Sequence, residues 1–287
     1  MTLTPVIYER NYSWGPAELK LGTRTQIMGI LNVTPDSFSD GGRYNQVDLA
    51  VAHAIQMMED GADLIDIGGE STRPGSETVS AEEELSRIIP VIEALKLQAP
   101  HIPISVDTYK AEVARQAILA GAHIINDVWG AKADPDMART AVDLGCPIIL
   151  MHNRPERDYT SYLDDVVQDL QESIQIALNA GVQPDQIILD PGIGFVKDIT
   201  ENLTLMSSLG LLNEMGYPVL LATSRKRFIQ NTLQVQANDT VEGTAATVAF
   251  GIAQGCQMVR VHDVKLIRRT ADMCDAMLYA SPGLRRK

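Results

Sequence analysis

The chain has 287 residues, a length typical of one large domain or two ordinary ones. Its 24 Lys and Arg stand against 37 Asp and Glu, and this formal net charge of −13 argues against a nucleic-acid or anionic-membrane surface, since both need a basic face. Apolar residues make up 45% of the chain, which excludes disorder, and no apolar run reaches the ~18 residues that a bilayer span needs.

The first residues and the cysteines bear on the compartment. The opening MTLTPVIYERNYSWG has neither the apolar core of a signal peptide nor an Arg-rich transit pattern. The three cysteines, Cys146, Cys256 and Cys274, are odd in number and never arranged as C-x-x-C. We therefore expect reduced packing residues in a cytoplasmic protein, and no metal site or disulfide framework built on cysteine.

Eight apolar, β-rich runs recur from residue 26 onward, and each is apolar at its start, as expected of strands that are buried on both faces. The runs are QIMGILNVT (26–34), ADLIDIGG (62–69), PISVDT (103–108), HIINDV (123–128), PIILMH (147–152), IILDPGIGF (187–195), PVLLATSR (218–225) and MVRVHDV (258–264). No low-complexity linker separates them, so the sequence predicts one domain.

The segments between the runs have a helical period near 3.6. The apolar residues that share one helical face are Val51, Ala54, Ile55 and Met58 in the first segment, and Leu85, Ile88, Ile89, Ile92 and Leu95 in the second. Ser80, with Glu83 three residues later, forms a capping-box pattern at the start of the second helix. Pro90 lies inside that helix and predicts a kink or a division.

Six glycines stand shortly before strands, where a left-handed residue past a helix end would turn the chain back: Gly61, Gly121, Gly145, Gly181, Gly216 and Gly255. Eight βα units fit an α/β fold of the (β/α)8 TIM-barrel type. A doubly wound sheet would usually have a G-x-G-x-x-G turn after its first strand, and this sequence has none. We expect residues 1–25 to cap the lower end of a barrel over 26–280, with an exposed basic tail over 281–287.

Polar residues end each run, at the place where the active site of such a barrel lies. They are Asn32, Asp66, Asp107, Asn126, Asp127, His152, Asp190, Ser224, Arg225, Lys226, Arg260 and His262. A lone Asp or Asn there is most often a cap of the next element, an interpretation that is strong for Asp127 and fair for Asp107. Unrelated caps would not also supply basic residues, so the set as a whole indicates a binding site.

Arg260 and His262 are two residues apart on one strand and therefore share a face. If that face points inward, the buried arginine needs an anionic partner. Two interpretations stay open at this point: a carboxylate from a neighbouring strand, or an anionic ligand.

The chemistry of the set suits a nitrogen heterocycle at the centre of the barrel and a diphosphate at its rim. Asp107, Asn126 and Asp190 offer acceptors and an amide for a flat ligand rich in N–H donors. The cationic donors for phosphate or carboxylate are Arg73, Lys226, Arg260 and His262. Asn32 offers one oxygen to a Mg²⁺ ion that keeps waters and phosphate oxygens as its other ligands.

Two polar loops follow the first two strands, PDSFSDGGRYN (35–45) and STRPGSET (71–78), and each includes an arginine. They are either ordinary surface loops or segments that close over a substrate. The five histidines show no H-x-H or H-E-x-x-H spacing, and no G-x-S-x-G or Walker motif is present, which excludes a zinc hydrolase or a serine esterase.

Several segments resemble the signature motifs of the dihydropteroate synthase family. They are MGILNVTPDSFSDGG (28–42), DIGGESTRPG (66–75), LDPGIGF (189–195), SRK (224–226) and RVHDV (260–264). The resemblance runs from about residue 25 to 275. It implies a TIM barrel, usually dimeric, that joins (7,8-dihydropterin-6-yl)methyl diphosphate to 4-aminobenzoate with Mg²⁺ as cofactor, in folate synthesis, and that is a sulfonamide target.

The resemblance also implies roles for single residues. The pterin-binding positions are Asp107, Asn126, Asp190 and Lys226; the Mg²⁺ ligand is Asn32, with Asp40 as a helper; the diphosphate contacts are Thr72, Arg260 and His262; and the 4-aminobenzoate pocket is formed by Phe38, Arg73, Pro74, Phe195 and Lys226. Asp107, Lys226, Arg260 and His262 would be catalytic. Loss of diphosphate leaves a cation on the exocyclic methylene, which Asp107 stabilises, while Mg²⁺, Arg260 and His262 stabilise the leaving diphosphate.

The chain departs from the family pattern at MHNRP (151–155), at Val196 in place of a frequent glycine, and at Gln230 in place of another. Two alternatives to a synthase stay open. One is a domain that binds methyltetrahydrofolate for methyl transfer, and the other is a pterin-binding protein without turnover. The partners expected are the two substrates and a second copy of the chain, with no nucleic acid and no membrane.

Overall fold

Eight parallel strands close into a barrel in the order β10-β11-β4-β5-β6-β7-β8-β9. The computed structural model describes residues 5–34, 43–71, 78–280 and 284–287, and of residues 43–45 the backbone alone. The barrel strands are β4 (Gln26–Asn32), β5 (Leu64–Gly68), β6 (Ile104–Asp107), β7 (Ile124–Asp127), β8 (Ile148–Met151), β9 (Ile187–Asp190), β10 (Val219–Ala222) and β11 (Cys256–Val261). Seven of them lie inside the predicted runs, and β11 begins two residues before its run, so the predicted (β/α)8 barrel is confirmed.

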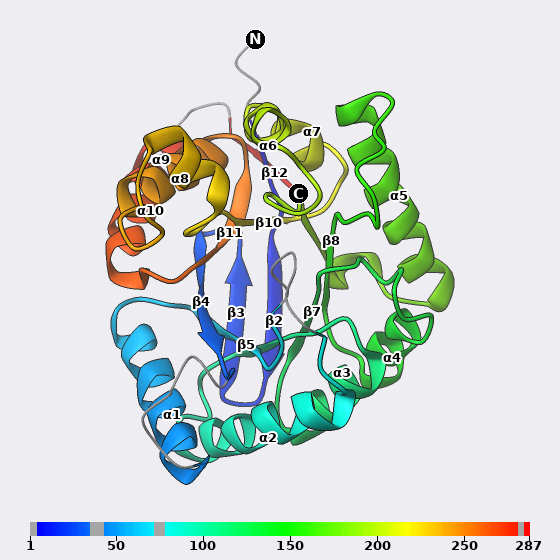
Figure 1. The fold of residues 1–287 in the computed structure, drawn as a ribbon, viewed down its shortest axis with the longest axis vertical. Helices are drawn as coiled ribbons and strands as arrows, with labels where there is room; N and C mark the ends of the chain where they lie inside the picture. Colours follow the sequence, from blue (N-terminus) through cyan, green and yellow to red (C-terminus); the bar gives the residue numbers. More distant parts are fainter. Residues whose placement is uncertain (1–4, 35–42, 72–77, 281–283) are drawn as a thin grey trace.

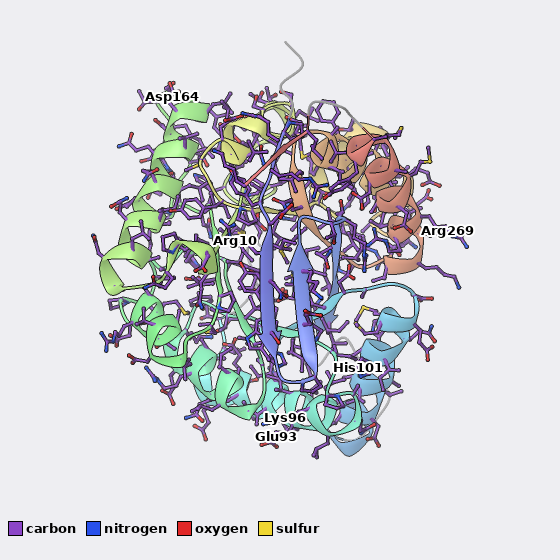
Figure 2. All side chains as sticks on the ribbon, turned by 180° about the vertical axis from the view of Figure 1, so that it is seen from behind. Arg10, Glu93, Lys96, His101, Asp164 and Arg269 are labelled. Carbon is purple, nitrogen blue, oxygen red and sulfur yellow. The ribbon has the colours of Figure 1, made fainter. Side chains whose placement is uncertain are left out.

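Helices surround the barrel as an outer ring (Figure 1). They are α1 (Arg43–Glu59), α2 (Ala81–Gln98), α3 (Ala111–Ala120), α4 (Met137–Leu144), α5 (Tyr162–Ala180), α6 (Ile199–Met206), α7 (Gly210–Asn213), α8 (Arg227–Leu233), α9 (Val241–Ala253) and α10 (Val264–Tyr279). All six glycines expected at the returns to the barrel have positive φ, between +62° and +133°. Charged side chains such as Glu93, Lys96, Asp164 and Arg269 extend from the outside of the ring (Figure 2).

Helix α2 differs from expectation in two respects. Ser80 Oγ accepts a hydrogen bond from the Glu83 N–H at 3.1 Å, but the Glu83 side chain pairs with Arg87, so only half of the predicted capping box forms. Pro90 does not divide the helix, which continues to Gln98. Its buried face, which includes Ile88 and Val91, packs in the main core and holds the helix together across the proline.

The lower end of the barrel is covered by an antiparallel hairpin, β2 (Arg10–Trp14) and β3 (Ala17–Leu21), which faces the viewer in Figure 2. Apolar side chains from the hairpin and from inside the barrel form one core cluster: Tyr12, Leu19, Leu21, Met28, Leu64, Ile124, Ile149, Ile188, Leu220 and Met258. This apolar layer seals the end of the barrel away from the strand carboxyl ends.

The tail is more ordered than expected. β1 (Val6–Ile7) pairs in parallel with β12 (Arg285–Arg286), and the Lys287 N–H donates to the Ile7 carbonyl at 2.9 Å. The side chains of β12 are exposed, but its backbone is joined to the other end of the chain. The domain boundaries at residues 25 and 280 stay a prediction.

The remaining general expectations concern cysteines and membranes. Cys146 and Cys256 are buried, Cys274 is partly buried, and all three are free thiols, as expected. Among the helices that the structure describes, none combines the length and the apolar character that crossing a membrane requires.

Candidate active site

The polar site lies two residues further along the strands than the apolar layer. Side chains at positions i and i+2 share a face of a strand. Two residues after the inward-facing Leu64, Ile124 and Ile188 come Asp66, Asn126 and Asp190, which therefore also face inward. Arg260 follows Met258 in the same way. The strand period therefore places a polar layer directly above the apolar one, at the carboxyl ends of the strands.

The register aligns residues from four consecutive strands at the rim. Asn32 pairs with Gly68, Gly68 with Asp107, and Asp107 with Asn126. A β-carbon on Gly68 would lie 3.7 Å from Asp107 Oδ2 and 3.8 Å from Asn32 Oδ1. The absence of a side chain at Gly68 thus leaves room between two oxygen atoms that face the same point.

Arg260 occupies the centre of the polar layer. Its Nε donates to Asp66 Oδ2 at 2.6 Å, and its terminal nitrogen donates to Asp107 Oδ2 at 2.8 Å. Asn126 Nδ2 donates to the same Asp66 oxygen at 3.2 Å. Of the two partners considered for Arg260, neighbouring carboxylates are present in the structure, and its contact with a diphosphate stays a prediction.

Within the described residues, two buried carboxylate oxygens have no hydrogen-bond partner, Asp66 Oδ1 and Asp107 Oδ1. Both carboxylates are buried, with 0% and 5% of the residue exposed. Leaving a buried acceptor unsatisfied costs about 1–3 kcal/mol, more for a charged group, so the pair is suited to a ligand that brings N–H donors. Burial also raises the pKa of Asp107 to about 7, against the opposing effect of Arg260.

Asp190 and Lys226 form the next part of the site. Asp190 Oδ1 accepts from the Gly192 N–H at 2.7 Å, and burial raises the pKa of Asp190. Lys226 Nζ donates to the Ile193 carbonyl and lies over the Phe195 ring, 4.9 Å from its centroid. Burial lowers the pKa of Lys226 to about 8, although Asp190 opposes this effect.

His262 lies beside the loop that follows β10. Ser224 Oγ and His262 Nδ1 are 3.0 Å apart, and the His262 backbone N–H donates to Ser224 Oγ at 3.2 Å. Arg225 holds Asp263 through two hydrogen bonds of 3.2 and 2.7 Å. These contacts fix the loop just before Lys226, which is the N-cap residue of α8.

The other strand-end residues have different roles. Asp127 accepts from the N–H groups of Trp129 and Ala131 at 2.8 and 2.6 Å, so it caps the turn after β7, as expected of it. The sequence also allowed Asp107 to cap the next element, but its carboxylate pairs with Arg260 instead.

Five predicted residues lie outside the described residues: Phe38, Asp40, Thr72, Arg73 and Pro74. The two polar loops, 35–45 and 71–78, fall there for the most part. Within the described part of the chain, no group of three or more His, Cys, Asp or Glu side chains is placed to hold a metal ion.

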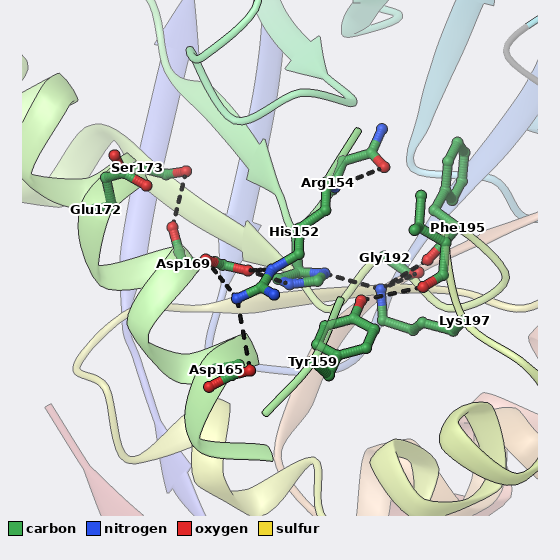
Figure 3. Close-up of polar contacts among 12 residues, drawn as sticks. His152, Arg154, Tyr159, Asp165, Asp169, Glu172, Ser173, Gly192, Phe195 and Lys197 are labelled. Carbon is green, nitrogen blue, oxygen red and sulfur yellow. Dashed lines mark hydrogen bonds and ion pairs between the residues drawn. The ribbon is translucent and has the colours of Figure 1, made fainter. Parts of the chain in front are cut away.

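Asp66 is one of the predicted strand-end residues, but no role was predicted for it, and a second polar network was not predicted. Lys197 Nζ lies 2.8 Å from His152 Nδ1, and His152 Nε2 lies 2.9 Å from Asp169 Oδ2 (Figure 3). Asp66 could have been found from its position two residues after the inward-facing Leu64. The network has no such signal, because its members come from three separate elements.

Comparisons with known proteins show which family the chain belongs to. The profile of the pterin binding enzyme family matches residues 28–262. A dihydropteroate synthase of Bacillus subtilis (strain 168) is 59% identical over 263 residues, which cover 92% of this chain and 92% of the relative.

Two solved structures extend the comparison to the fold. A dihydropteroate synthase of Xanthomonas albilineans with 4-aminobenzoic acid has a TM-score of 0.89 and 41% identity, over 96% of this chain and 100% of that one. One from Clostridium difficile, solved in the presence of pteroic acid, has a TM-score of 0.87 and 47% identity, over 89% of this chain and 97% of that one. The chain belongs to the pterin binding enzyme family and, within it, to the dihydropteroate synthases.

Proposed function

We propose that the polar layer at the strand ends holds the pterin diphosphate, with 4-aminobenzoate beside Phe195 and Lys226. As a dihydropteroate synthase, the enzyme condenses these two substrates to 7,8-dihydropteroate and diphosphate in folate synthesis. The observation that carries the assignment is the pair of unsatisfied oxygens, Asp66 Oδ1 and Asp107 Oδ1, buried beside the Asn126 amide. A pterin ring carries N–H groups that can donate hydrogen bonds to these two oxygens.

The reaction breaks the C–O bond between the exocyclic methylene and the diphosphate, and the electron pair leaves with the diphosphate. The methylene carbon becomes cationic, and the Asp107 carboxylate stabilises it from the polar layer. The nitrogen of the neutral aryl amine then bonds to that carbon and releases a proton to water. Attack by a neutral amine needs no strong general base, so the lack of a base paired with a nucleophile in the described site is no obstacle.

The basic residues act on the leaving group. Arg260 is already oriented by Asp66 and Asp107, so its guanidinium needs no reorganisation when charge develops on the diphosphate. His262 lies at the mouth of the barrel beside Ser224, where we expect it to contact the diphosphate. Lys226 lies between Asp190 and the Phe195 ring and so faces both substrates.

The residues present fit a magnesium ion that is bound largely by the substrate. Asn32 Oδ1 faces the space above Gly68 and offers one hard oxygen, and Mg²⁺ usually takes few protein ligands beside phosphate oxygens and water. When bound, the ion neutralises charge on the leaving diphosphate. Asp40, the second candidate ligand, lies outside the described residues.

A homodimer in the cytoplasm completes the proposal. Large apolar side chains on α6, α7, α9 and α10 are 44–61% exposed, which is consistent with a covered face on this side of the ring: Leu203, Leu211, Phe250, Met273 and Met277. Light scattering coupled to gel filtration would give twice the chain mass for a dimer. The free thiols suit a reducing compartment, which cell fractionation would test.

The test of the function is to incubate the protein with Mg²⁺ and the pterin diphosphate, and to measure diphosphate release with and without 4-aminobenzoate. Release coupled to dihydropteroate formation is expected, and Lys226→Ala should abolish most of it while Lys265→Ala, an exposed lysine, should not. Release without an adduct would point to another acceptor. Bound pterin without release would favour the methyltransferase or the binding protein.

A further inference from the structure

The loop between β9 and α6, residues 191–198, forms one wall of the site. Its Ile193 carbonyl accepts from Lys226 Nζ, and its Phe195 ring lies under the same ammonium group. A β-carbon on Gly194 would come within 2.9 Å of Lys226 Cδ, so the loop backbone packs closely against that side chain. The position of Phe195 and of Lys226 therefore depends on the conformation of this loop.

That conformation is strained. Gly192 and Gly194 have φ of +65° and +86°, which glycine tolerates. Val196 has φ of +45°, and for a β-branched residue the left-handed region costs about 1–2 kcal/mol. Strained residues persist where surrounding contacts hold them, so the loop needs contacts that fix it.

Lys197 supplies those contacts from behind the wall (Figure 3). Its Nζ donates to the Gly192 carbonyl at 2.9 Å and to the Phe195 carbonyl at 3.0 Å, and it lies 2.8 Å from His152 Nδ1. One amino group thus contacts both ends of the turn and connects it to His152 at the end of β8. Tyr159 adds a fourth contact, since its hydroxyl donates to the Val196 carbonyl at 3.1 Å.

The anchor behind Lys197 is itself fixed. His152 is fully buried, and burial lowers its pKa to about 4, so its ring is neutral. The tautomer with its proton on Nε2 donates to Asp169 Oδ2 at 2.9 Å and leaves Nδ1 to accept from Lys197 Nζ. Burial lowers the pKa of Lys197 to about 7, and its amino group carries hydrogens to donate in either protonation state. Burial works to raise the pKa of Asp169, but the hydrogen bonds from His152 and Arg154 outweigh it and keep the carboxylate ionised.

We infer that Lys197 is a positioning residue for the aryl-amine side of the active site, acting through the backbone that carries Phe195. The inference rests on the proposed function, in which Phe195 faces 4-aminobenzoate. Among the described residues, Lys197 makes no hydrogen bond with Asp66, Asp107 or Arg260. Its charge acts on Asp190, and the loop also contacts Lys226, so we expect a smaller effect on the pterin side than on the aryl-amine side.

The test is the Lys197→Met variant, measured with each substrate varied in turn. We expect the KM for 4-aminobenzoate to rise about tenfold or more, while the KM for the pterin diphosphate and kcat change by less than about threefold. Lys197→Gln keeps two N–H donors on a shorter side chain and should give an intermediate KM. If Lys197→Met does not fold, the Gln variant decides the question by the same criterion.

Lys132→Met is the matched control. Lys132 is a second lysine whose charge acts on His152 and Asp169, but it pairs with Glu172 at 3.9 Å and not with the loop. It should leave both KM values unchanged. In a Phe195→Ala background, Lys197→Met should raise the KM for 4-aminobenzoate by less than about twofold, because the route through Phe195 is already lost.

The outcomes separate the two proposals. If the wild-type protein forms no dihydropteroate, the proposed function fails. If the wild type is active but Lys197→Met raises both KM values equally, or raises neither, Lys197 is only a structural residue and the inference is wrong.

Discussion

Arg260 on β11 and Asp107 on β6 form a 2.8 Å hydrogen-bonded ion pair across the mouth of the barrel, although 153 residues separate them in sequence. Asp66 holds the other side of the same guanidinium. The two carboxylates orient the arginine before any substrate arrives, and each has one oxygen without a hydrogen-bond partner in the part of the chain that the structure describes. The same contacts therefore hold the barrel mouth together and leave acceptors for a ligand.

Replacing the arginine tests the first of these roles. Arg260→Met would leave Asp66 and Asp107 buried without their cation, and breaking a buried pair in this way costs about 3–5 kcal/mol. Urea unfolding should show a loss of that size, whereas the exposed Arg269→Met should change the free energy of unfolding by less than about 0.5 kcal/mol. Equal stability of the two variants would mean that the ion pair contributes nothing.

The raised pKa of Asp107 predicts a pH dependence of stability. Burial raises this pKa from 3.8 to about 7, so between these values the folded protein keeps a proton that the unfolded chain has released. The contribution of this group to stability therefore falls as the pH rises through that range. Urea unfolding at pH 5 and pH 7.5 should show a larger loss for the wild type than for Asp107→Asn, and parallel losses would contradict the shift.

Val196 offers a test of backbone strain. Glycine relieves the left-handed strain of about 1–2 kcal/mol but costs about 0.5–1 kcal/mol in chain entropy. Val196→Gly should therefore leave the melting temperature unchanged or raise it, whereas Val235→Gly, at a loop residue that is not among those with positive φ, should lower it. A fall for Val196→Gly as large as the fall for Val235→Gly would show that Val196 is not strained.

The hairpin at the lower end should matter for stability and not for catalysis. Leu19 is 1% exposed and packs in the inner layer of the barrel, so Leu19→Ala should cost about 2–5 kcal/mol. Because the polar layer lies at the other end of the strands, kcat should stay within twofold of the wild type. Leu97→Ala, at a residue that is 83% exposed, is the matched control and should change neither.

Local patterns in the sequence predicted the parts of the fold that depend on neighbouring residues. The six glycines before strands are left-handed as expected, since a helix end needs only its own next residue to turn back. The predicted division of α2 at Pro90 was wrong, because packing of the buried face of the helix compensates for the one backbone hydrogen bond that proline cannot donate. Asp198 and Glu201 form a complete capping box at α6, which was not predicted.

Contacts between distant strands could not be predicted in the same way. The sequence showed that Arg260 needs an anionic partner, but only closure of the barrel brings Asp66 and Asp107 to it. The Lys197–His152 contact joins two connections 45 residues apart and has no periodicity to reveal it. Contacts of this kind depend on which strands are neighbours in the closed barrel, and local sequence patterns do not show that order.

The measurement that tests the central claim most directly is a calorimetric titration of the pterin diphosphate into the wild type, Asp107→Asn and Asp164→Asn. The Asp107→Asn change replaces one acceptor oxygen by an amide NH2 donor, which must face either Arg260 or the ligand. It should weaken binding about tenfold or more, while Asp164→Asn, an exposed control on α5, should bind like the wild type. Binding of wild-type strength by Asp107→Asn would contradict the placement of the pterin at the strand ends.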